Sequence, residues 1–342
     1  MATVYWLDGF ELYNDVAELL KVYTMVGTHP TYLGISTSQY RTGAQGLSIL
    51  GDADGVKWTD VTLTNTTIVF GFAVKISKLT AAVWNNPDIA LIDMSGNYIL
   101  RFIHNTTGHM CVYRGSTLLG TTTNPIWSTT AFNFVEIKVY AHESAGTVEI
   151  RLNGNTTPEL SLSGIDTIEG SATMIQGFRL TAGFSNGYNY WDDLYLASDF
   201  LGDSKIDVIR VTGAGNYSQF APLSGSNYEN VDESRGPDDD TTYNDGDAVN
   251  EIDTYQMADL AAGDTIHALK IQGSYKKTDA GTALMKQVLR INSTDYYGDE
   301  KTLTTDYTTE SDIFNLNPDD SAAFETADIN ALELGCEVTD LG

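Results

Sequence analysis

The sequence predicts an all-β protein whose cores are β-sandwiches, and three observations support this prediction. Residues 134–154, FVEIKVYAHESAGTVEIRLNG, alternate apolar and polar side chains on both sides of a short turn. Residues 68–76 carry the clearest apolar stripe in the chain, again with a period of two, which is typical of a strand with one buried face. The connections between such stretches are short and rich in Gly, Asn, Ser and Thr, and no long helical pattern interrupts the first 200 residues.

Residues 134–154 are predicted to form a β-hairpin, and the other elements are placed relative to it. The apolar positions of its two strands are Val135, Ile137, Val139, Ala141, Val148, Ile150 and Leu152. Asn153-Gly154 follows directly, and Asn-Gly is the pair best suited to the positive φ angles of a type I′ turn, so a third strand should fold back. The apolar face of such a sheet needs a second layer, which another sheet packed about 10 Å away supplies.

The remaining elements of the first domain follow in chain order. We expect an edge strand in residues 1–13 and a short helix in residues 16–26, whose N-cap is Asn14 or Asp15. Further strands are expected at residues 47–50, 68–76, 90–93, 98–103, 110–113, 174–182 and 193–196. Since the last of these should lie beside the N-terminal strand, the first domain is expected to close near residue 200.

A second, mostly-β domain is predicted to follow, with the boundary between Ala197 and Ser204, so that the domains are residues 1–200 and 201–342. Its strands are expected at residues 206–211, 266–272, 284–291 and 336–338. A short C-terminal helix is expected at residues 322–334, capped by Asp320 or Ser321 and ended by Gly335 in a left-handed conformation.

The charge of the chain excludes several classes of partner. Its 342 residues include 19 Lys and Arg against 46 Asp and Glu, which gives a net charge of −27. Such a surface repels nucleic-acid phosphates and anionic membranes, so no nucleic-acid partner is expected. No run approaches the roughly 18 apolar residues of a membrane span, and the start MATVYWLDGFE lacks the pattern of a signal peptide. We therefore expect synthesis in a cytoplasm and no membrane insertion.

The cysteines and the common catalytic motifs give little indication of chemistry. Cys111 and Cys336 are expected to be free, largely buried thiols, because a single pair in different domains does not make a disulfide framework. His109 and Cys111 share one face of a predicted strand but lack two further zinc ligands nearby. The chain contains no HExxH, CxxC or Gly-rich phosphate loop.

An acidic stretch, residues 232–264, contains eleven Asp or Glu and one basic residue. A polar segment of this length in a compact domain is usually functional or mobile, and we expect a mobile loop or a contact between subunits. Within it, Asp238, Asp240, Asp245 and Asp247 offer oxygen ligands for Ca²⁺, although their spacing is not that of an EF-hand. The alternative is a solvated acidic loop. No other cofactor or metal site is expected.

Tyr188, Tyr190 and Trp191 form the densest aromatic cluster outside a clearly predicted strand. Aromatic rings beside amide side chains are typical of a surface that contacts glycans or a protein partner. Aromatic cross-strand pairs inside a sandwich explain the same composition, so both interpretations stay open.

The motif VEIKV, a loop and then VEIRLNG resembles the central hairpin of concanavalin A-like lectin and laminin G-like sandwiches. Four further segments are similar to the version of this module found in tailed-phage virion proteins: LDGFELYND, KVYTMVG, YRTGAQGLSILG and YWDDLYLAS. Three later segments resemble the domain that often follows the module in these proteins: LGDSKIDVIRV, DDDTTY and ADINALELGCEV. This resemblance implies an N-terminal concanavalin A-like (jelly-roll) sandwich followed by a second β-rich phage structural domain. It also implies location in the virion.

Laminarinase-type glycosidases share the lectin-like sandwich and use paired carboxylates on one strand. The nearest equivalents here are Asp192-Asp193 and Glu149, and none lies in an E-x-D-x-x-E pattern, whereas retaining hydrolysis needs two carboxyls about 5–5.5 Å apart. We therefore expect no catalytic residues and no enzymatic activity.

The expected function is a structural protein of a tailed-phage virion, either a surface-exposed tail or fibre component or a capsid-decorating one. Its expected partners are copies of itself, other virion proteins and host-surface glycans. The alternatives are a carbohydrate-active enzyme resembling laminarinase and a free lectin.

Overall fold

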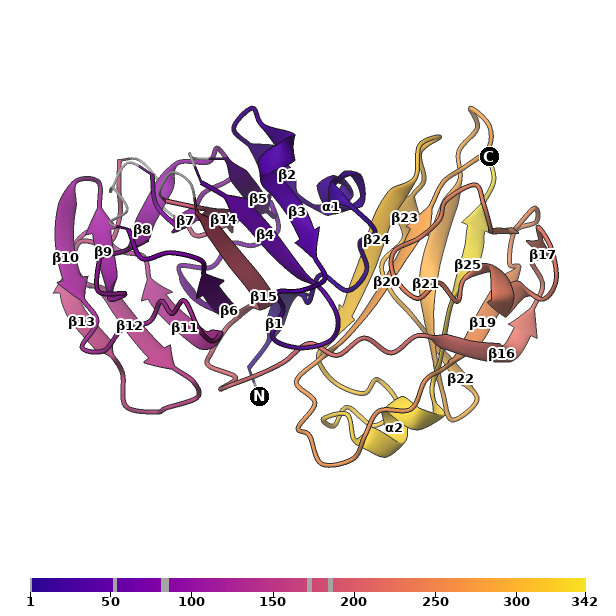
Figure 1. Ribbon diagram of the computed structural model, residues 1–342. Helices are drawn as coiled ribbons and strands as arrows, with labels where there is room; N and C mark the ends of the chain where they lie inside the picture. The colour runs from indigo at the N-terminus through magenta and orange to yellow at the C-terminus, as the bar shows by residue number, and fades with distance from the viewer. Residues whose placement is uncertain (1, 52–53, 81–85, 171–173, 184–186) are drawn as a thin grey trace. The chain divides into compact units, whose positions relative to one another are not determined.

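The computed structural model describes residues 2–51, 54–80, 86–170, 174–183 and 187–342 (Figure 1). The chain forms two compact units, Ala2–Asp207 and Val208–Gly342. The division lies beyond the predicted boundary, because residues 199–207 are bonded to the first unit. Each unit is described by itself below.

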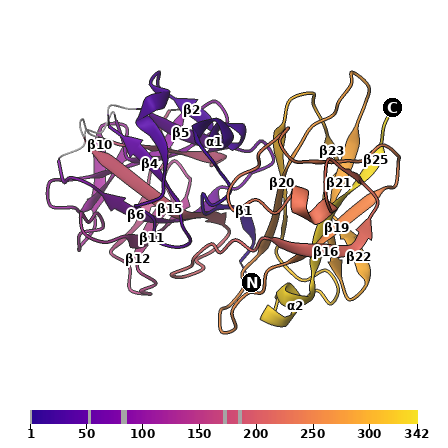
Figure 2. The same cartoon turned by 45° about the vertical axis from the view of Figure 1, so that its right-hand side comes forward.

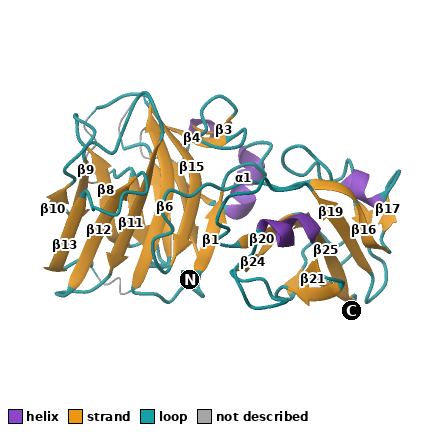
Figure 3. Cartoon of the chain, turned by 90° about the horizontal axis from the view of Figure 1, so that it is seen from below, coloured by secondary structure: helices purple, strands orange, loops and turns teal. Residues whose placement is uncertain are grey.

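The first unit is a sandwich of two antiparallel sheets, as the sequence predicts. The larger sheet has the order β13 (Leu160–Ile165), β12 (Gly146–Leu152), β11 (Asn133–Tyr140), β6 (Thr67–Ile76), β15 (Tyr188–Ala197), β4 (Gly46–Leu50) and β3 (Leu33–Ser36), and β1 (Val4–Asp8) also pairs with β15. The smaller sheet has the order β10 (Thr117–Thr121), β9 (Met110–Arg114), β8 (Tyr98–His104), β7 (Ile89–Ile92), β14 (Gly177–Thr181), β5 (Gly55–Thr59) and β2 (Thr24–Val26). Figure 3 shows β13, β12, β11, β6 and β15 side by side.

The predicted hairpin is confirmed as β11 and β12. Ile137 pairs with Ile150 in the register that the alternation requires. Asn153 and Gly154 have φ angles of 49° and 71°, which only a few residue types adopt readily. The third strand, β13, pairs with β12 as expected but begins only at Leu160, so the connection is longer than a two-residue turn.

Apolar side chains from both sheets fill the space between them. Phe70 and Phe72 on β6 are fully buried, and Phe70 stacks on Phe178 of the opposite sheet with ring centroids 4.6 Å apart. Burying such rings contributes about 1.5–3 kcal/mol each. The strand stripe predicted at residues 68–76 is therefore the centre of the core.

Helix α1 covers Val16–Val22, and Asp15 caps it by accepting hydrogen bonds from the N–H groups of Ala17 and Glu18. The prediction of a helix through residue 26 is wrong at its end. Tyr23 is extended, with ψ 151°, and residues 24–26 form β2 instead, because their N–H and C=O groups pair with β5. No described helix has an apolar stretch long enough to cross a membrane.

The second unit is also mostly β (Figure 2). Its main sheet has the order β16 (Val211–Ser218), β19 (Ile252–Met257), β25 (Glu333–Asp340), β21 (Leu284–Ile291) and β22 (Thr294–Tyr297), and β23 (Lys301–Thr302) also pairs with β21. Two ribbons pair β17 (Ala221–Pro222) with β18 (Asn244–Asp245) and β20 (Leu269–Tyr275) with β24 (Thr308–Phe314). Short 3₁₀ turns lie at Pro30–Tyr32 in the first unit and Asn227–Asn230 in the second.

Three predictions for the second unit need correction. The strand expected at residues 206–211 begins only at Val211. The helix expected at residues 322–334 is α2, Thr326–Ala331, and its capping residue is Glu325. Gly335 does not end this helix but lies inside β25, where a Cβ atom would be 1.8 Å from the carbonyl oxygen of Asp253 on β19. The glycine is therefore required by the close approach of two strands.

The two cysteines are free thiols, as expected, with Cys111 buried and Cys336 half-buried. Burial raises the pKa of the Cys336 thiol to about 12. The ring of His109 is within hydrogen-bond distance of the Thr122 carbonyl oxygen, at 2.9 Å.

Candidate functional site

Strand β15 runs through the larger sheet of the first unit between β6 on one side and β4 and β1 on the other. Alternation along the strand directs Trp191 into the core and Tyr190 and Asp192 to the outer face, and an irregularity after Asp192 returns Leu194 to the core. The pairing with β6 is irregular at Asp193, whose φ is 51°. This bulge places two consecutive carboxylates beside each other near the outer face.

The tyrosine patch consists of Tyr188, Tyr190, Ser48, Lys75 and Gln39. The two rings are nearly parallel, with centroids 5.8 Å apart and planes inclined by 12°, and Tyr188 is 40% exposed. Ser48 on β4 and Lys75 on β6 are the sheet partners of Tyr190, one on each side. Lys75 Nζ donates a hydrogen bond to Gln39 Oε1 at 2.8 Å. Apolar ring faces flanked by donors and acceptors match a sugar ring, which has apolar C–H faces and polar hydroxyls.

Trp191 belongs to the core, so the expectation that all three rings form a contact surface is corrected. Its side chain is fully buried and lies edge-on to Phe72 and Trp127, with centroid distances of 5.6 and 5.8 Å. The cause is strand alternation, because residues two apart share a face and the next residue points to the opposite one. Ser185 and Asn186, which precede the patch, lie outside the described residues.

The carboxylates of Asp192 and Asp193 lie under the loop that carries Arg41 and Thr42. Asp192 Oδ2 accepts hydrogen bonds from the backbone N–H groups of Arg41 and Thr42 at 2.6 and 3.1 Å. Asp193 accepts from the Thr42 hydroxyl at 2.6 Å, and from the Arg41 guanidinium and the Ile206 N–H at 2.8 Å each. Neither carboxylate is exposed by more than 1%.

The two carboxyls hold protons differently. Burial, and next the charge of Asp193, raises the pKa of Asp192 to about 8. Burial also raises the pKa of Asp193, while hydrogen bonds from Thr42 and Ile206 and the charge of Arg41 act in the opposite direction. Asp192 is therefore mostly protonated at neutral pH, which is the state of a general acid. Buried carboxyls of this kind also occur at purely structural sites.

Residues 199–207, which we call the strap, cross the outer face of the larger sheet. The Glu136 side chain on β11 accepts hydrogen bonds through Oε1 from the N–H groups of Leu201 and Gly202 at 2.8 and 2.9 Å. Arg41 donates to the Ser204 carbonyl oxygen at 2.7 Å and forms an ion pair with Asp203. The strap is therefore fixed at several points by the buried Glu136 and the half-buried Arg41.

The structure does not bring Glu149 to the two aspartates. Glu149 lies on β12, which β11 and β6 separate from β15, so the strand axes are about 14 Å apart. Glu149 instead accepts a hydrogen bond from Arg151 at 2.7 Å. Glycoside hydrolysis requires two carboxyls about 5–9.5 Å apart. Glu149 is too far away to form such a pair, so Asp192 and Asp193 remain as the candidate pair.

The acidic segment at residues 232–264 is not the continuous loop that its charge suggests, because it contains β18 and β19. Asp238 accepts hydrogen bonds from the backbone and hydroxyl of Thr242 at 3.1 and 2.8 Å. Asp240 forms an ion pair with Lys276. Across the described residues, no group of three or more His, Cys, Asp or Glu side chains is arranged to hold a metal ion.

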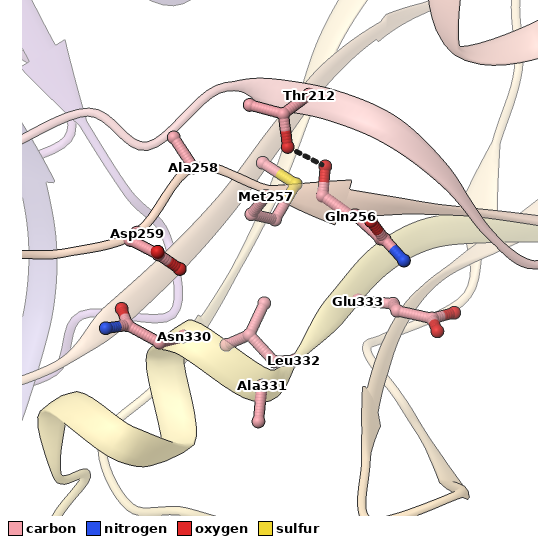
Figure 4. Close-up of a pocket in the computed structure, with 9 residues that line it drawn as sticks. All are labelled: Thr212, Gln256, Met257, Ala258, Asp259, Asn330, Ala331, Leu332 and Glu333. Carbon is pink, nitrogen blue, oxygen red and sulfur yellow. Dashed lines mark hydrogen bonds between the residues drawn. The ribbon is translucent and has the colours of Figure 1, made fainter.

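The second unit has a surface depression of about 540 Å³ (Figure 4). It is lined by Thr212, Gln256, Met257, Ala258, Asp259, Asn330, Ala331, Leu332 and Glu333. Thr212 donates to the Gln256 carbonyl oxygen at 3.3 Å, Asn330 is bonded to the backbone of Leu260, and Glu333 accepts from the Thr254 hydroxyl at 2.6 Å. These polar groups already have partners, so the depression suggests no chemistry.

Sequence reasoning missed four residues around β15: Gln39, Arg41, Lys75 and Glu136. Each lies far along the chain from β15, and an unpaired lysine or glutamate on a strand is usually a solvated surface residue. For Glu136 the available signal was its central position in the predicted hairpin, where a neighbouring strand and a distant segment can cover an outward-facing side chain.

No protein-family model matches the chain, and no curated protein matches its sequence. Among solved structures, the chain is similar to Trypanosoma rangeli sialidase with a TM-score of 0.34 and 14% identity, over 50% of this chain and 27% of the sialidase. It is similar to a family 131 β-glucanase catalytic domain from Podospora anserina with a TM-score of 0.40 and 14% identity, over 59% and 98% of the two chains. It is also similar to a carbohydrate esterase from Shiga toxin-encoding bacteriophage phi24B, with a TM-score of 0.40 and 10% identity, over 58% and 100%.

The prediction that the protein has no enzymatic activity is corrected by this comparison. The three similar structures are a sialidase, a glucanase catalytic domain and a carbohydrate esterase. The sequence prediction depended on the absence of an E-x-D-x-x-E pattern, which tests for one arrangement of carboxylates and not for catalysis in general.

Proposed function

We propose that the first unit binds carbohydrate through the tyrosine patch. The observation that carries this proposal is the parallel pair of Tyr188 and Tyr190 on the outer face of the sheet, with Ser48 and Lys75 directly opposite Tyr190. The rings offer apolar faces on which sugar C–H groups pack, and the flanking hydroxyl, amide and ammonium groups offer partners for sugar hydroxyls.

The test is binding of a panel of oligosaccharides, measured by calorimetry, with the intact protein and with Tyr188→Ala and Tyr190→Ala. Each substitution should weaken binding about tenfold, because stacking on one ring is lost while the polar partners stay. Tyr243→Ala is the matched control, since Tyr243 is 38% exposed in the second unit, and it should leave binding unchanged. Undetectable binding of every sugar at millimolar concentration, or equal binding by all variants, would rule out the proposal.

A second candidate function is hydrolysis of the bound glycan, and the observation that favours it is the buried pair of Asp192 and Asp193. Burial and the charge of Asp193 raise the pKa of Asp192 to about 8, so Asp192 could act as a general acid, while Asp193 forms an ion pair with Arg41. The loop of Arg41 and Thr42 would have to move for a sugar to reach them. Release of reducing ends by the wild type, and its loss in Asp192→Asn with the fold retained, would support this function.

We also propose, from the resemblance of the sequence, that the protein acts as a tailed-phage virion component, on the tail or fibre or decorating the capsid. Its partners there would be further copies of the chain and other virion proteins. Many copies on one particle would multiply a weak sugar contact. Mass spectrometry of purified particles tests the location, and absence of the polypeptide from them would contradict it.

A further inference from the structure

Lys75 supplies the positive charge of the tyrosine patch. The described part of the chain places no carboxylate within ion-pair distance of its Nζ, whose hydrogen-bond partner is the neutral amide of Gln39 at 2.8 Å. Other lysines of the first unit, such as Lys21 and Lys138, do have carboxylate partners.

A nearby carboxyl on the same face does not supply the missing charge. Asp192 lies two residues along β15 from Tyr190, the sheet partner of Lys75. Its Oδ2 accepts the N–H groups of Arg41 and Thr42, and its Oδ1 accepts the N–H of Asp193. Because burial and Asp193 raise its pKa to about 8, Asp192 is mostly neutral at pH 7. The ammonium of Lys75, which extends from the position opposite Tyr190 on the neighbouring strand, therefore has no described carboxylate as its partner.

We propose that the ligand of the tyrosine patch is an acidic glycan, in which a carboxylated sugar pairs with Lys75 while a sugar ring stacks on Tyr188 or Tyr190. This inference rests on the proposed carbohydrate binding and specifies its ligand class. A charge-assisted hydrogen bond between ammonium and carboxylate is about twice as strong as a neutral one, and Gln39 already orients the ammonium.

The net charge of the protein limits how acidic this glycan can be. With a net charge of −27, the whole molecule repels a densely charged polyanion at long range. Pairing with one lysine offsets the repulsion of one carboxylate and not of many. The ligand class is therefore a sparsely charged glycan, in which neutral sugars separate the carboxylated ones.

The experiment compares a uronic-acid-containing oligosaccharide with its carboxyl-reduced form, which has the same sugars without the charge. The wild type should bind the acidic form about tenfold more tightly. Lys75→Gln should lose this preference and bind both forms equally, whereas Lys75→Arg, which keeps the charge, should retain it. Lys57→Gln, on the other sheet, is the control and should change neither affinity.

The outcomes separate this inference from the function on which it rests. If the carboxyl-reduced form binds as tightly as the acidic form to the wild type, the inference is wrong and carbohydrate binding stands. If neither form binds, carbohydrate binding by the patch is itself contradicted for this sugar class. If circular dichroism shows that Lys75→Gln is unfolded, the inference is still tested by comparing how the wild type and Lys75→Arg bind the two sugars.

Discussion

The hydroxyl of Tyr195 on β15 donates a hydrogen bond to the carboxylate of Glu136 on β11, across the strand β6 that lies between them. Both residues pair with Gly71 of β6. A Cβ atom on Gly71 would lie 2.0 Å from Cε1 of the Tyr195 ring, so the ring lies directly on the glycine backbone. The same Glu136 oxygen receives two N–H groups of the strap, and this links the strap to the centre of the sheet.

Gly71→Ala should therefore destabilise the protein, because a methyl group in a close-packed central strand must displace the Tyr195 ring. We expect the free energy of unfolding to fall by about 1–3 kcal/mol, measured by chemical denaturation. Gly213→Ala is the control, since its nearest neighbour would be the end of the Gln256 side chain at 3.3 Å. In a Tyr195→Ala background the cost of Gly71→Ala should shrink, and an unchanged cost would show that the ring is not the obstacle.

The strap predicts where the first unit ends. A fragment of residues 2–207 should fold and unfold cooperatively, whereas a fragment of residues 2–198 should be less stable. The shorter fragment lacks the N–H groups of Leu201, Gly202 and Ile206, which leaves Glu136 and Asp193 buried with fewer partners. An unpartnered buried carboxylate costs about 1–3 kcal/mol or more. Equal thermal midpoints for the two fragments would mean that the strap contributes nothing to the unit.

The elements that the sequence could predict are those whose signal is local. The hairpin β11–β12 follows from a period of two within about 20 residues, and Asp15 caps α1 through neighbours two and three residues away. Strand β19 was missed because it contains Asp253, which is fully buried and accepts hydrogen bonds from Gln219, Phe220 and Asn227. The sequence does not distinguish a buried aspartate with such partners from a solvated one. The high density of acidic residues in this segment therefore wrongly indicated a loop.

The candidate site was only partly predictable for the same reason. Tyr188 and Tyr190 could be named from composition, and strict use of strand alternation would have excluded Trp191. The partners of β15 could not be named, because Arg41 is more than 150 positions away from Asp192 and Asp193 in the chain. Which distant segment covers a strand depends on the packing of the whole unit and not on the residues of the strand.

The two kinds of aromatic residue in β15 should behave differently when replaced. Trp191→Ala should lower the free energy of unfolding by about 3–5 kcal/mol, since it leaves a cavity among Phe72 and Trp127. Tyr188→Ala should change it by less than about 0.5 kcal/mol, because the ring is 40% exposed. Denaturation of both variants under one condition tests the contrast, and a small effect of Trp191→Ala would contradict its place in the core.

Arg41 is expected to hold the strap and the bulge of β15 together. Arg41→Met keeps most of the side-chain length but removes the ion pairs with Asp193 and Asp203 and the bond to Ser204. Since Asp193 is 1% exposed, its unpaired charge should cost about 3–5 kcal/mol, and hydrogen exchange in residues 199–207 should accelerate. The control is Lys205→Gln in the same segment, which removes a more exposed pair with Asp207 and should change stability by under about 1 kcal/mol.

The buried Asp192 gives stability a pH dependence whose direction can be worked out. In the unfolded chain an aspartate ionises near pH 3.9, whereas in the folded protein the pKa of Asp192 is about 8. Between these values the folded state holds a proton that the unfolded state has released, so the contribution of Asp192 is fully present below about pH 4. It is lost as pH rises toward 8, at up to about 1.4 kcal/mol per pH unit.

Asp192→Asn should remove this slope, because an amide does not titrate. Between pH 4.5 and 7.5, the free energy of unfolding of the wild type should fall more steeply with pH than that of the variant. The difference between the two slopes should correspond to the release of close to one proton on unfolding. The absolute stability of the variant is not the readout, since the amide changes the bonds to Arg41, Thr42 and Asp193. His104 contributes in the same direction in both proteins, because Asp88 raises the pKa of its ring against burial, and it cancels in the comparison. Parallel profiles for the two proteins would show that Asp192 is ionised in the folded state, and the assignment of Asp192 as the protonated member of the pair would then be wrong.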